Sequence, residues 1–169
     1  MRLSVEAGQL TVEGVYLFLC HPGRQRTATL FYPLPEDSLL GEAQMLALDC
    51  RPFAGGTDAW EPVPFESTPH RPGARWVVPL DRSDSLVVLA RYRQRLHGSY
   101  ARYILTSTQA WGQPLRHARF ELTLPRGARL DASSYPLSRM AAASAEEPHY
   151  VFETRDFMPP EDLTITWSR

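Results

Sequence analysis

The clearest pattern in the chain is an alternation of apolar and polar residues between positions 85 and 124. Ser85 to Leu96 alternates first, Tyr100 to Thr106 alternates next, and Phe120 to Leu124 alternates last. Alternation with period two, bounded by Gly and Pro, is typical of half-buried antiparallel strands. The pattern therefore predicts three strands, the first two joined as a hairpin through His97-Gly98-Ser99.

Further strands are predicted on both sides of this hairpin. The segments with apolar or alternating patterns are residues 1–6, 9–20, 26–32, 42–49, 75–80, 116–124, 150–153 and 163–167. The segments 9–20 and 26–32 are expected to pair with each other. Pro62 and Pro64 confine residues 60–65 to a sheet edge or an extended loop, because proline donates no hydrogen bond to a sheet.

These segments amount to about eight to ten strands with short connections. Two antiparallel sheets packed face to face would bury one face of each strand, so the expected fold is an all-β sandwich with at most one short helix. Residues 140–147 have the only composition that favours a helix. The expected inward set is Tyr16, Phe18, Leu30, Tyr32, Val88, Ala90, Tyr92, Phe120, Leu122, Leu124, Phe152, Leu163, Ile165 and Trp167.

The length fits a single domain over residues 1–169. Because the chain opens and closes on predicted strands, we expect it to be a domain excised from a longer protein.

The formal net charge is -1, which argues against general nucleic-acid binding. The sequence contains no run of transmembrane length and no apolar segment typical of a signal peptide.

Lysine and asparagine are both absent from the sequence. A Schiff-base lysine, the lysine of a phosphate-binding loop and N-glycosylation are therefore excluded.

Cys20 and Cys50 are the only cysteines, and each follows an apolar run that predicts a strand. Two buried thiols and an inter-strand disulfide both fit this placement, and a disulfide would indicate an oxidising compartment.

Arg91, Arg93 and Arg95 alternate along the first predicted hairpin strand and share one of its faces. We expect Arg102 to extend this face across the turn. Such a face could bind an anion or an acidic partner, because guanidinium groups bind carboxylates and phosphates through paired hydrogen bonds. The alternative is a solvated outer face whose arginines pair with carboxylates on neighbouring strands, such as Glu121 and Glu153.

Aromatic residues offer a second candidate binding surface. Trp111, Trp60 and Tyr100 could form a platform for a sugar, because aromatic faces stack on the apolar faces of sugar rings. Gly112 and Pro114 place Trp111 on a loop, where binding residues concentrate. The alternative is that these aromatic residues belong to the core.

The sequence favours neither a metal site nor a catalytic site. The five histidines have no spacing typical of metal ligands, so neither a metal nor another cofactor is expected. The sequence lacks the G-x-S-x-G motif of a nucleophilic serine. Asp58, Glu61 and Glu66 form the best cluster of carboxylates, which a polar loop explains equally well.

Several segments resemble bacterial secreted or envelope-associated β-sandwich domains of uncharacterised function. These are Tyr32 to Pro35, Tyr103 to Leu115, Tyr150 to Glu153 and Phe157 to Leu163. The resemblance covers about half the chain and implies an immunoglobulin-like sandwich and a periplasmic or extracellular location. It implies no catalytic residues. A cytoplasmic location stays open, because no signal peptide is recognised in the sequence.

The sequence thus favours a non-catalytic interaction or structural module of a bacterial envelope or secreted protein, with another protein as its partner. The first alternative is a carbohydrate-binding module that uses exposed aromatic residues. The second alternative is a hydrolase, whose site the pattern of the sequence does not reveal.

Overall fold

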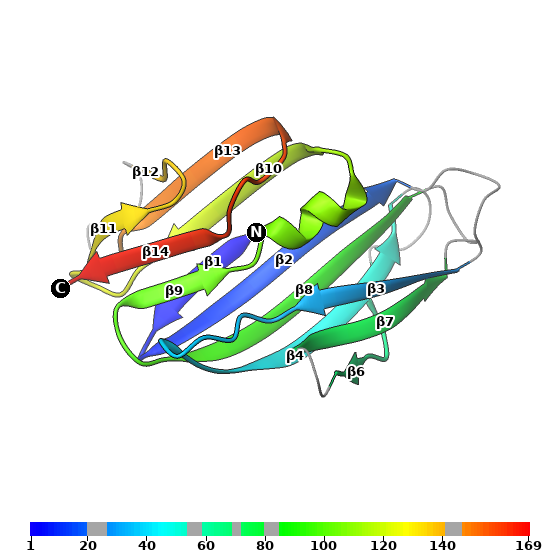
Figure 1. Ribbon diagram of the computed structural model, residues 1–169, viewed down its shortest axis with the longest axis horizontal. Coiled ribbons are helices and arrows are strands. Elements are labelled where there is room, and N and C mark those ends of the chain that lie inside the picture. Colours follow the sequence, from blue (N-terminus) through cyan, green and yellow to red (C-terminus); the bar gives the residue numbers. More distant parts are fainter. Residues whose placement is uncertain (20–26, 54–58, 69–71, 80–84, 141–146) are drawn as a thin grey trace.

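The computed structural model describes residues 1–19, 27–53, 59–68, 72–79, 85–140 and 147–169 (Figure 1). This part of the chain is all-β apart from one short 3₁₀ helix. Its elements are β1 (Arg2–Glu6), β2 (Gln9–Leu19), β3 (Thr27–Pro33), β4 (Leu40–Pro52), β5 (Glu61–Pro62), β6 (Glu66–Ser67), β7 (Gly73–Pro79), β8 (Ser85–Leu96), β9 (Tyr100–Tyr103), η1 (Thr106–Trp111), β10 (Leu115–Thr123), β11 (Arg129–Ser133), β12 (Ser138–Arg139), β13 (His149–Phe157) and β14 (Leu163–Ser168). None of the described helices is long and apolar enough to span a membrane.

The largest sheet has eight strands in the order β12-β13-β10-β1-β2-β8-β4-β5. The long strands β2 and β8 form its centre and pair along their whole length, from Gln9 opposite Arg95 to Leu19 opposite Ser85. The pairs are antiparallel except for β1 and β10, which run parallel. The predicted strand at residues 42–49 is confirmed within β4, and the edge position predicted for residues 60–65 is confirmed by β5.

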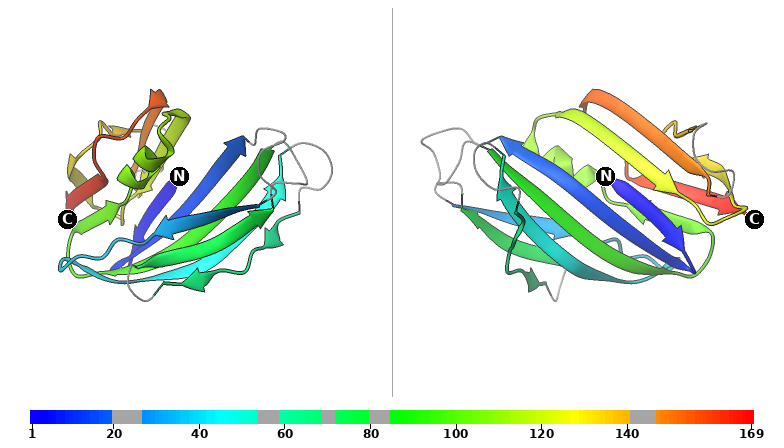
Figure 2. Two further views of the ribbon diagram at one scale, coloured as in Figure 1. Left: turned by 45° about the vertical axis from the view of Figure 1, so that its right-hand side comes forward. Right: turned by 180° about the vertical axis from the view of Figure 1, so that it is seen from behind.

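Two small sheets, β11-β14-β9 and β3-β7-β6, lie against the same face of the large sheet (Figures 1 and 2). A single hydrophobic core fills the space between these layers. Tyr92, Leu122 and Ile165 are among its most deeply buried side chains. All residues of the predicted inward set lie in this core or pack against it, so the alternation pattern identified the buried faces correctly.

The predicted hairpin between residues 85–96 and 100–106 is wrong. β8 pairs with β2 and β4 in the large sheet, whereas β9 pairs with β14 in a small sheet. Residues 97–99 therefore connect two layers of the sandwich instead of two neighbouring strands. Alternation reports which face of a strand is buried but not which strand it pairs with, and both strands here face the same core.

The expected pairing of residues 9–20 with 26–32 is also wrong. β2 lies in the large sheet, whereas β3 pairs with β7 in a small one. The described residues contain fourteen strands, more than the eight to ten expected, because the short strands β5, β6, β11 and β12 add to the predicted ones. The sheets of eight, three and three strands do not confirm the immunoglobulin-like topology that the resemblance implies.

Candidate functional site

A cavity of about 830 Å³ lies between the two small sheets, with the large sheet as its floor. Tyr16 and Val88 belong to the floor, Trp76 lines the wall formed by β3 and β7, and Tyr103 lines the wall formed by β9 and η1. Cavities that bind small molecules have volumes of about 300–1,000 Å³. The space between the sheets is therefore large enough for a small ligand.

Three tyrosines, one from each sheet, meet at this cavity. The hydroxyl oxygen of Tyr16 lies 2.6 Å from that of Tyr103 and 3.1 Å from that of Tyr32. The Tyr32 hydroxyl donates to the Tyr103 oxygen at 3.3 Å, which closes a triangle. We call these residues the tyrosine triad, and they connect all three sheets through hydrogen bonds.

Gly14 makes room for the first member of the triad. It lies two positions before Tyr16 on β2, so both side chains would point to the same face of the sheet. A Cβ atom at Gly14 would overlap with the Tyr16 ring. The glycine therefore allows the ring to lie back along the strand, where its hydroxyl reaches the facing sheets.

The triad is neutral at physiological pH. Burial raises the pKa values of Tyr16 and Tyr32 well above the ordinary value of a phenol, and burial also raises the pKa of Tyr103. Each neutral hydroxyl carries one proton, and either oxygen of the Tyr16–Tyr103 pair can be the donor. The triad therefore presents neutral hydroxyl groups to the cavity rather than charged ones.

Trp76 borders the same cavity and brings an unused hydrogen-bond donor. Its side chain is 6% exposed, and its indole Nε1 has no acceptor among the described residues. A buried N–H group without a partner destabilises a folded protein by about 1–3 kcal/mol, so such groups are rare. The Nε1 atom is itself buried, so an atom in the cavity could reach it only after a movement of the side chains around it.

Phe18 and Trp111 form the aromatic part of the lining that is nearest to solvent. Their rings meet edge to face, with centroids 5.8 Å apart, and Trp111 is 49% exposed. Trp111 ends η1, which is held in place by Asp162 in the bend before β14. The Asp162 carboxylate accepts hydrogen bonds from Leu105 N at 3.0 Å, Thr106 N at 3.1 Å and Thr106 Oγ1 at 2.8 Å.

The charged groups of the lining are Arg102 and Glu36. The guanidinium of Arg102 lies 3.4 Å from the Asp37 carboxylate and 3.7 Å from the Asp162 carboxylate. Its positive charge is thus balanced by two carboxylates of the protein. Glu36 is exposed and adds a negative charge at the rim.

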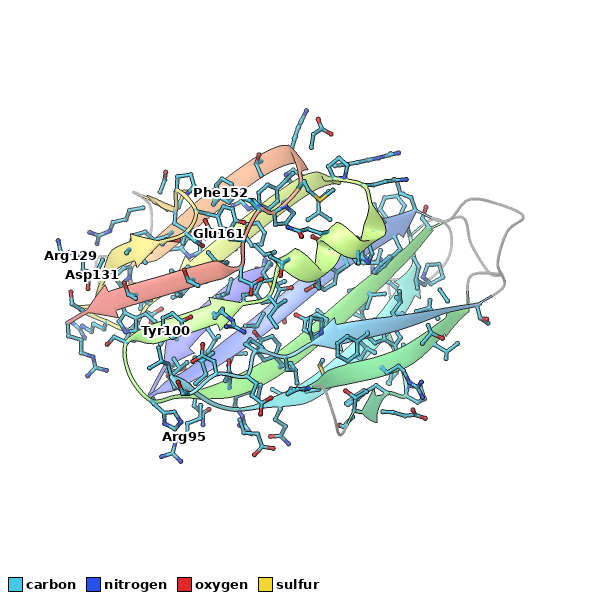
Figure 3. All side chains as sticks on the ribbon, in the orientation of Figure 1. Arg95, Tyr100, Arg129, Asp131, Phe152 and Glu161 are labelled. Atoms are coloured by element: carbon cyan, nitrogen blue, oxygen red, sulfur yellow. The ribbon has the colours of Figure 1, made fainter. Side chains whose placement is uncertain are left out.

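The predicted arginine face lies on the outer side of the large sheet, away from the cavity. Arg91 pairs with Glu13 on β2 at 2.7 Å, and Arg93 donates to Gln44 on β4 at 3.3 Å. Arg95 is exposed near the end of β8 (Figure 3). Arg93 and Arg95 also border a second, more polar cavity of about 960 Å³ beside β4.

Two expectations about this arginine face are wrong. Arg102 does not extend it, because β9 lies in a different sheet and Arg102 borders the interior cavity. Glu121 and Glu153 do not pair with it either, since both bind Arg119 on β10, at 2.8 Å and 2.7 Å.

The three predicted platform residues occupy different places. Trp60 precedes β5 at the edge of the large sheet, where the Arg51 guanidinium lies 5.1 Å from the centre of its ring. Tyr100 is half-buried at the start of β9 (Figure 3). Of the three, Trp111 is the one that lines the cavity. Among the described aromatic rings, no stacked or edge contact joins these three to one another.

The remaining candidates from the sequence are the two cysteines and the cluster of carboxylates. Cys50 is half-buried on β4, whereas Cys20 lies outside the described residues, so two thiols and a disulfide both stay open. Asp58 also lies outside the described residues, and Glu66 pairs with Arg75 at 2.8 Å. Within the described ranges, no group of three or more His, Cys, Asp or Glu side chains could hold a metal ion.

Sequence reasoning missed this cavity and assigned Tyr16 and Tyr32 to the core alone. Tyr16 and Tyr103 are 87 positions apart, and no local pattern indicates that strands from three sheets bring their hydroxyls together. A tyrosine at an inward position is the one signal that the sequence offers, because a buried phenol requires a hydrogen-bond partner.

No protein-family model, curated protein or solved structure matches this chain. The resemblance to bacterial envelope-associated domains therefore identifies no family. What the structure supports is a mostly-β protein with several sheets.

Proposed function

We propose that the protein is a non-catalytic binding module, an immunoglobulin-like β-sandwich, whose ligand occupies the cavity between β3 and η1. The observation that carries this proposal is the cavity itself, which has a volume of about 830 Å³ and is lined by Trp76, Trp111 and the tyrosine triad. Cavities of this volume are typical of small-molecule sites.

The walls of the cavity support binding in a second way. The tyrosine triad ties all three sheets together, so the groups around the ligand are held before it arrives. A site that is already organised loses less conformational entropy on binding than a flexible one. Trp111 and Phe18 add apolar surface near solvent, where a ligand would first make contact.

The proposal can be tested through the indole N–H signals of the four tryptophans, observed by NMR on protein labelled with ¹⁵N. The probe is a library of small fragments that includes phenols, amines, carboxylates and sugars. Binding in the cavity predicts fragments that shift the signals of Trp76 and Trp111. The signals of Trp60, at the edge of the large sheet, and Trp167, on β14, should stay unchanged. If no fragment shifts Trp76 and Trp111 together, the cavity is not a ligand site.

An envelope or extracellular location, with the module acting in a larger bacterial protein, forms the second part of this proposal. It rests on the resemblance described above, and it predicts a disulfide between Cys20 and Cys50. The intact mass after alkylation of the unfolded, unreduced protein tests it. An unmodified mass in a monomer is expected, and two alkylated thiols would contradict an oxidising location.

A further inference from the structure

We propose that an extended strand of a partner protein, with apolar residues at alternate positions, inserts into the large sheet between β2 and β10 and continues the line of β1. This inference is independent of the cavity between the small sheets. It assigns a protein-binding site to the backbone of the large sheet.

Two strand edges face the same open position inside the large sheet. β1 lies between β2 and β10, and its residue Arg2 is opposite Glu13 on one side and Glu121 on the other. Both neighbours continue past the N-terminus (Figure 2). Within the described part of the chain, no strand pairs with residues 15–19 of β2 or 115–119 of β10 on this side. Counted from Arg2, the two open edges have the same length and end level with each other.

The backbone groups of both edges point toward the open position. Leu96 N donates to Gly8 O at 2.8 Å, so even-numbered residues of β2 bond to β8 and odd-numbered ones face the open side. On β10, Met1 N donates to Arg119 O and Glu121 N donates to Met1 O, each at 2.9 Å, so odd-numbered residues face it too. Because N–H and C=O groups are presented from two sides, the ligand that pairs with both is an extended polypeptide.

β1 sets the direction of the inserted strand. β1 runs antiparallel to β2 and parallel to β10, so a strand that continues its line has its C-terminal end nearest Met1. Successive residues of that strand would bond to β2 and to β10 in turn. Addition of a strand to an exposed sheet edge is a common way for proteins to bind peptides, and its affinity comes from main-chain hydrogen bonds.

The side chains beside the open position select an apolar partner. Val15, Leu17 and Leu19 project from the outer face of this part of β2, and they are 53%, 48% and 45% exposed. On the inner face, Phe18 meets the half-exposed ring of Trp111. An unpaired strand edge that is also apolar is a template for pairing with another chain. A strand with apolar residues facing inward would cover Phe18 and Trp111.

The test uses the full chain labelled with ¹⁵N and the peptide Lys-Lys-Gly-Thr-Val-Thr-Val-Thr, together with versions that carry Ile, Leu or Phe in place of Val. Amide hydrogen exchange, observed by NMR, is the measurement. At least one peptide should slow the exchange of the Val15, Leu17 and His117 amides in a saturable manner. The amides of Tyr16 and Phe18 bond to β8 and should be unchanged.

Methylated peptides show whether the strand lies between two edges. N-methylation of the central Thr removes an N–H group that would face β2, and N-methylation of the Val after it removes one that would face β10. Each should weaken binding about tenfold. In the protein, Leu17→Pro removes an N–H group on the open side only and should abolish binding, whereas the matched control Leu17→Val should bind normally.

Three results would overturn the inference. The first is that no peptide slows exchange, and the second is that only the methylated Thr weakens binding, which would mean that the peptide adds to β2 alone. The third is that the Val15 and Leu17 amides are already protected without peptide. In a monomer this would assign the position to a segment of the chain itself, and in a dimer to a second copy. If Leu17→Pro does not fold, the methylated peptides still decide on the unmodified chain.

Discussion

The hydroxyl oxygens of Tyr16 and Tyr103 lie 2.6 Å apart and join the large sheet to one of the small sheets through the interior. Tyr32 joins the third sheet to the same pair. The layers of this sandwich are thus connected by a polar group of side chains as well as by apolar packing. The same group forms part of the wall of the candidate site.

Replacing Tyr103 by Phe should lower the free energy of unfolding by about 1–2 kcal/mol, measured by urea denaturation. The change removes the oxygen that contacts both other phenols, and it leaves Tyr16 and Tyr32 with fewer partners. The ring of Tyr103 stays, so apolar packing is preserved.

Tyr92→Phe is the matched comparison and should leave stability unchanged or raise it by up to about 1 kcal/mol. Tyr92 is fully buried beside Tyr32, but its hydroxyl has no hydrogen-bond partner among the described residues. Removing an unpaired polar atom relieves its desolvation. A larger loss of stability in Tyr92→Phe than in Tyr103→Phe would contradict the hydrogen-bonding scheme of the triad.

Stability should fall as the pH rises above about 10. Burial raises the pKa of Tyr16, Tyr32, Tyr92 and Tyr103 above their ordinary value of 10.0. Above this value the unfolded phenols lose protons that the folded ones keep, so the folded state binds more protons and is destabilised. Each such tyrosine contributes a slope of about 1.4 kcal/mol per pH unit until it ionises in the folded state.

Urea unfolding at a series of alkaline pH values measures this slope, and the phenolate absorbance of the folded protein reports ionisation directly. The chain has no lysine, so the tyrosine ionisation is not obscured by the titration of ammonium side chains in the same pH range. Ionisation of all seven tyrosines of the folded protein near pH 10.0 would contradict the burial of the triad.

Asp162→Ala should destabilise the protein by about 2–3 kcal/mol and weaken ligand binding. The change removes the acceptor of three hydrogen bonds from Leu105 and Thr106, which position η1 and therefore Trp111. Asp162→Asn keeps an acceptor oxygen and should lower the free energy of unfolding by less than Asp162→Ala does. Equal losses in the two variants, measured by urea denaturation, would show that the hydrogen bonds to η1 are not the cause.

Acid should lower the free energy of unfolding by weakening ion pairs on the outer face of the large sheet. The Arg119 hydrogen bond lowers the pKa of Glu121, and hydrogen bonds from His117 and then Arg119 lower the pKa of Glu153. Both carboxyls therefore bind fewer protons in the folded state, and the stability they contribute is present above about pH 4.5 and lost as the pH falls below it.

Arg119→Met should flatten this acid dependence, measured as the change in urea midpoint between neutral pH and about pH 3. The pairs are exposed, so the effect is expected to be small and to shrink further at about 1 M salt. An acid dependence in Arg119→Met that is as steep as in the unmodified chain would exclude these pairs as its source.

The sequence allowed the strands and their buried faces to be predicted because alternation is a local property. The fully buried Gln94 follows the same phase as Tyr92 and Leu96 on β8. Its amide nitrogen donates to the carbonyls of Pro35 and Gly41, each at 2.9 Å, which only the folded chain brings near. A polar residue in an inward phase thus requires a buried partner, and the sequence does not show which one it is.

Strand pairing and the cavity could not be predicted, because they depend on contacts between distant segments. The three-residue connection after Leu96 has the composition of a hairpin turn, yet it joins two layers. The arginines at positions 91, 93 and 95 were correctly assigned to one face, but their partners were not predicted, because the strands beside β8 were unknown. Trp76 showed no sign of an unpartnered donor, since its surroundings come from other strands.

A crystal structure of the protein soaked in a fragment that shifts the Trp76 and Trp111 signals tests the central claim most directly. We predict that the fragment lies between β3 and η1, in contact with Trp111. A cavity that contains only water, with the fragment absent or bound on the outer face of the large sheet, would contradict this prediction.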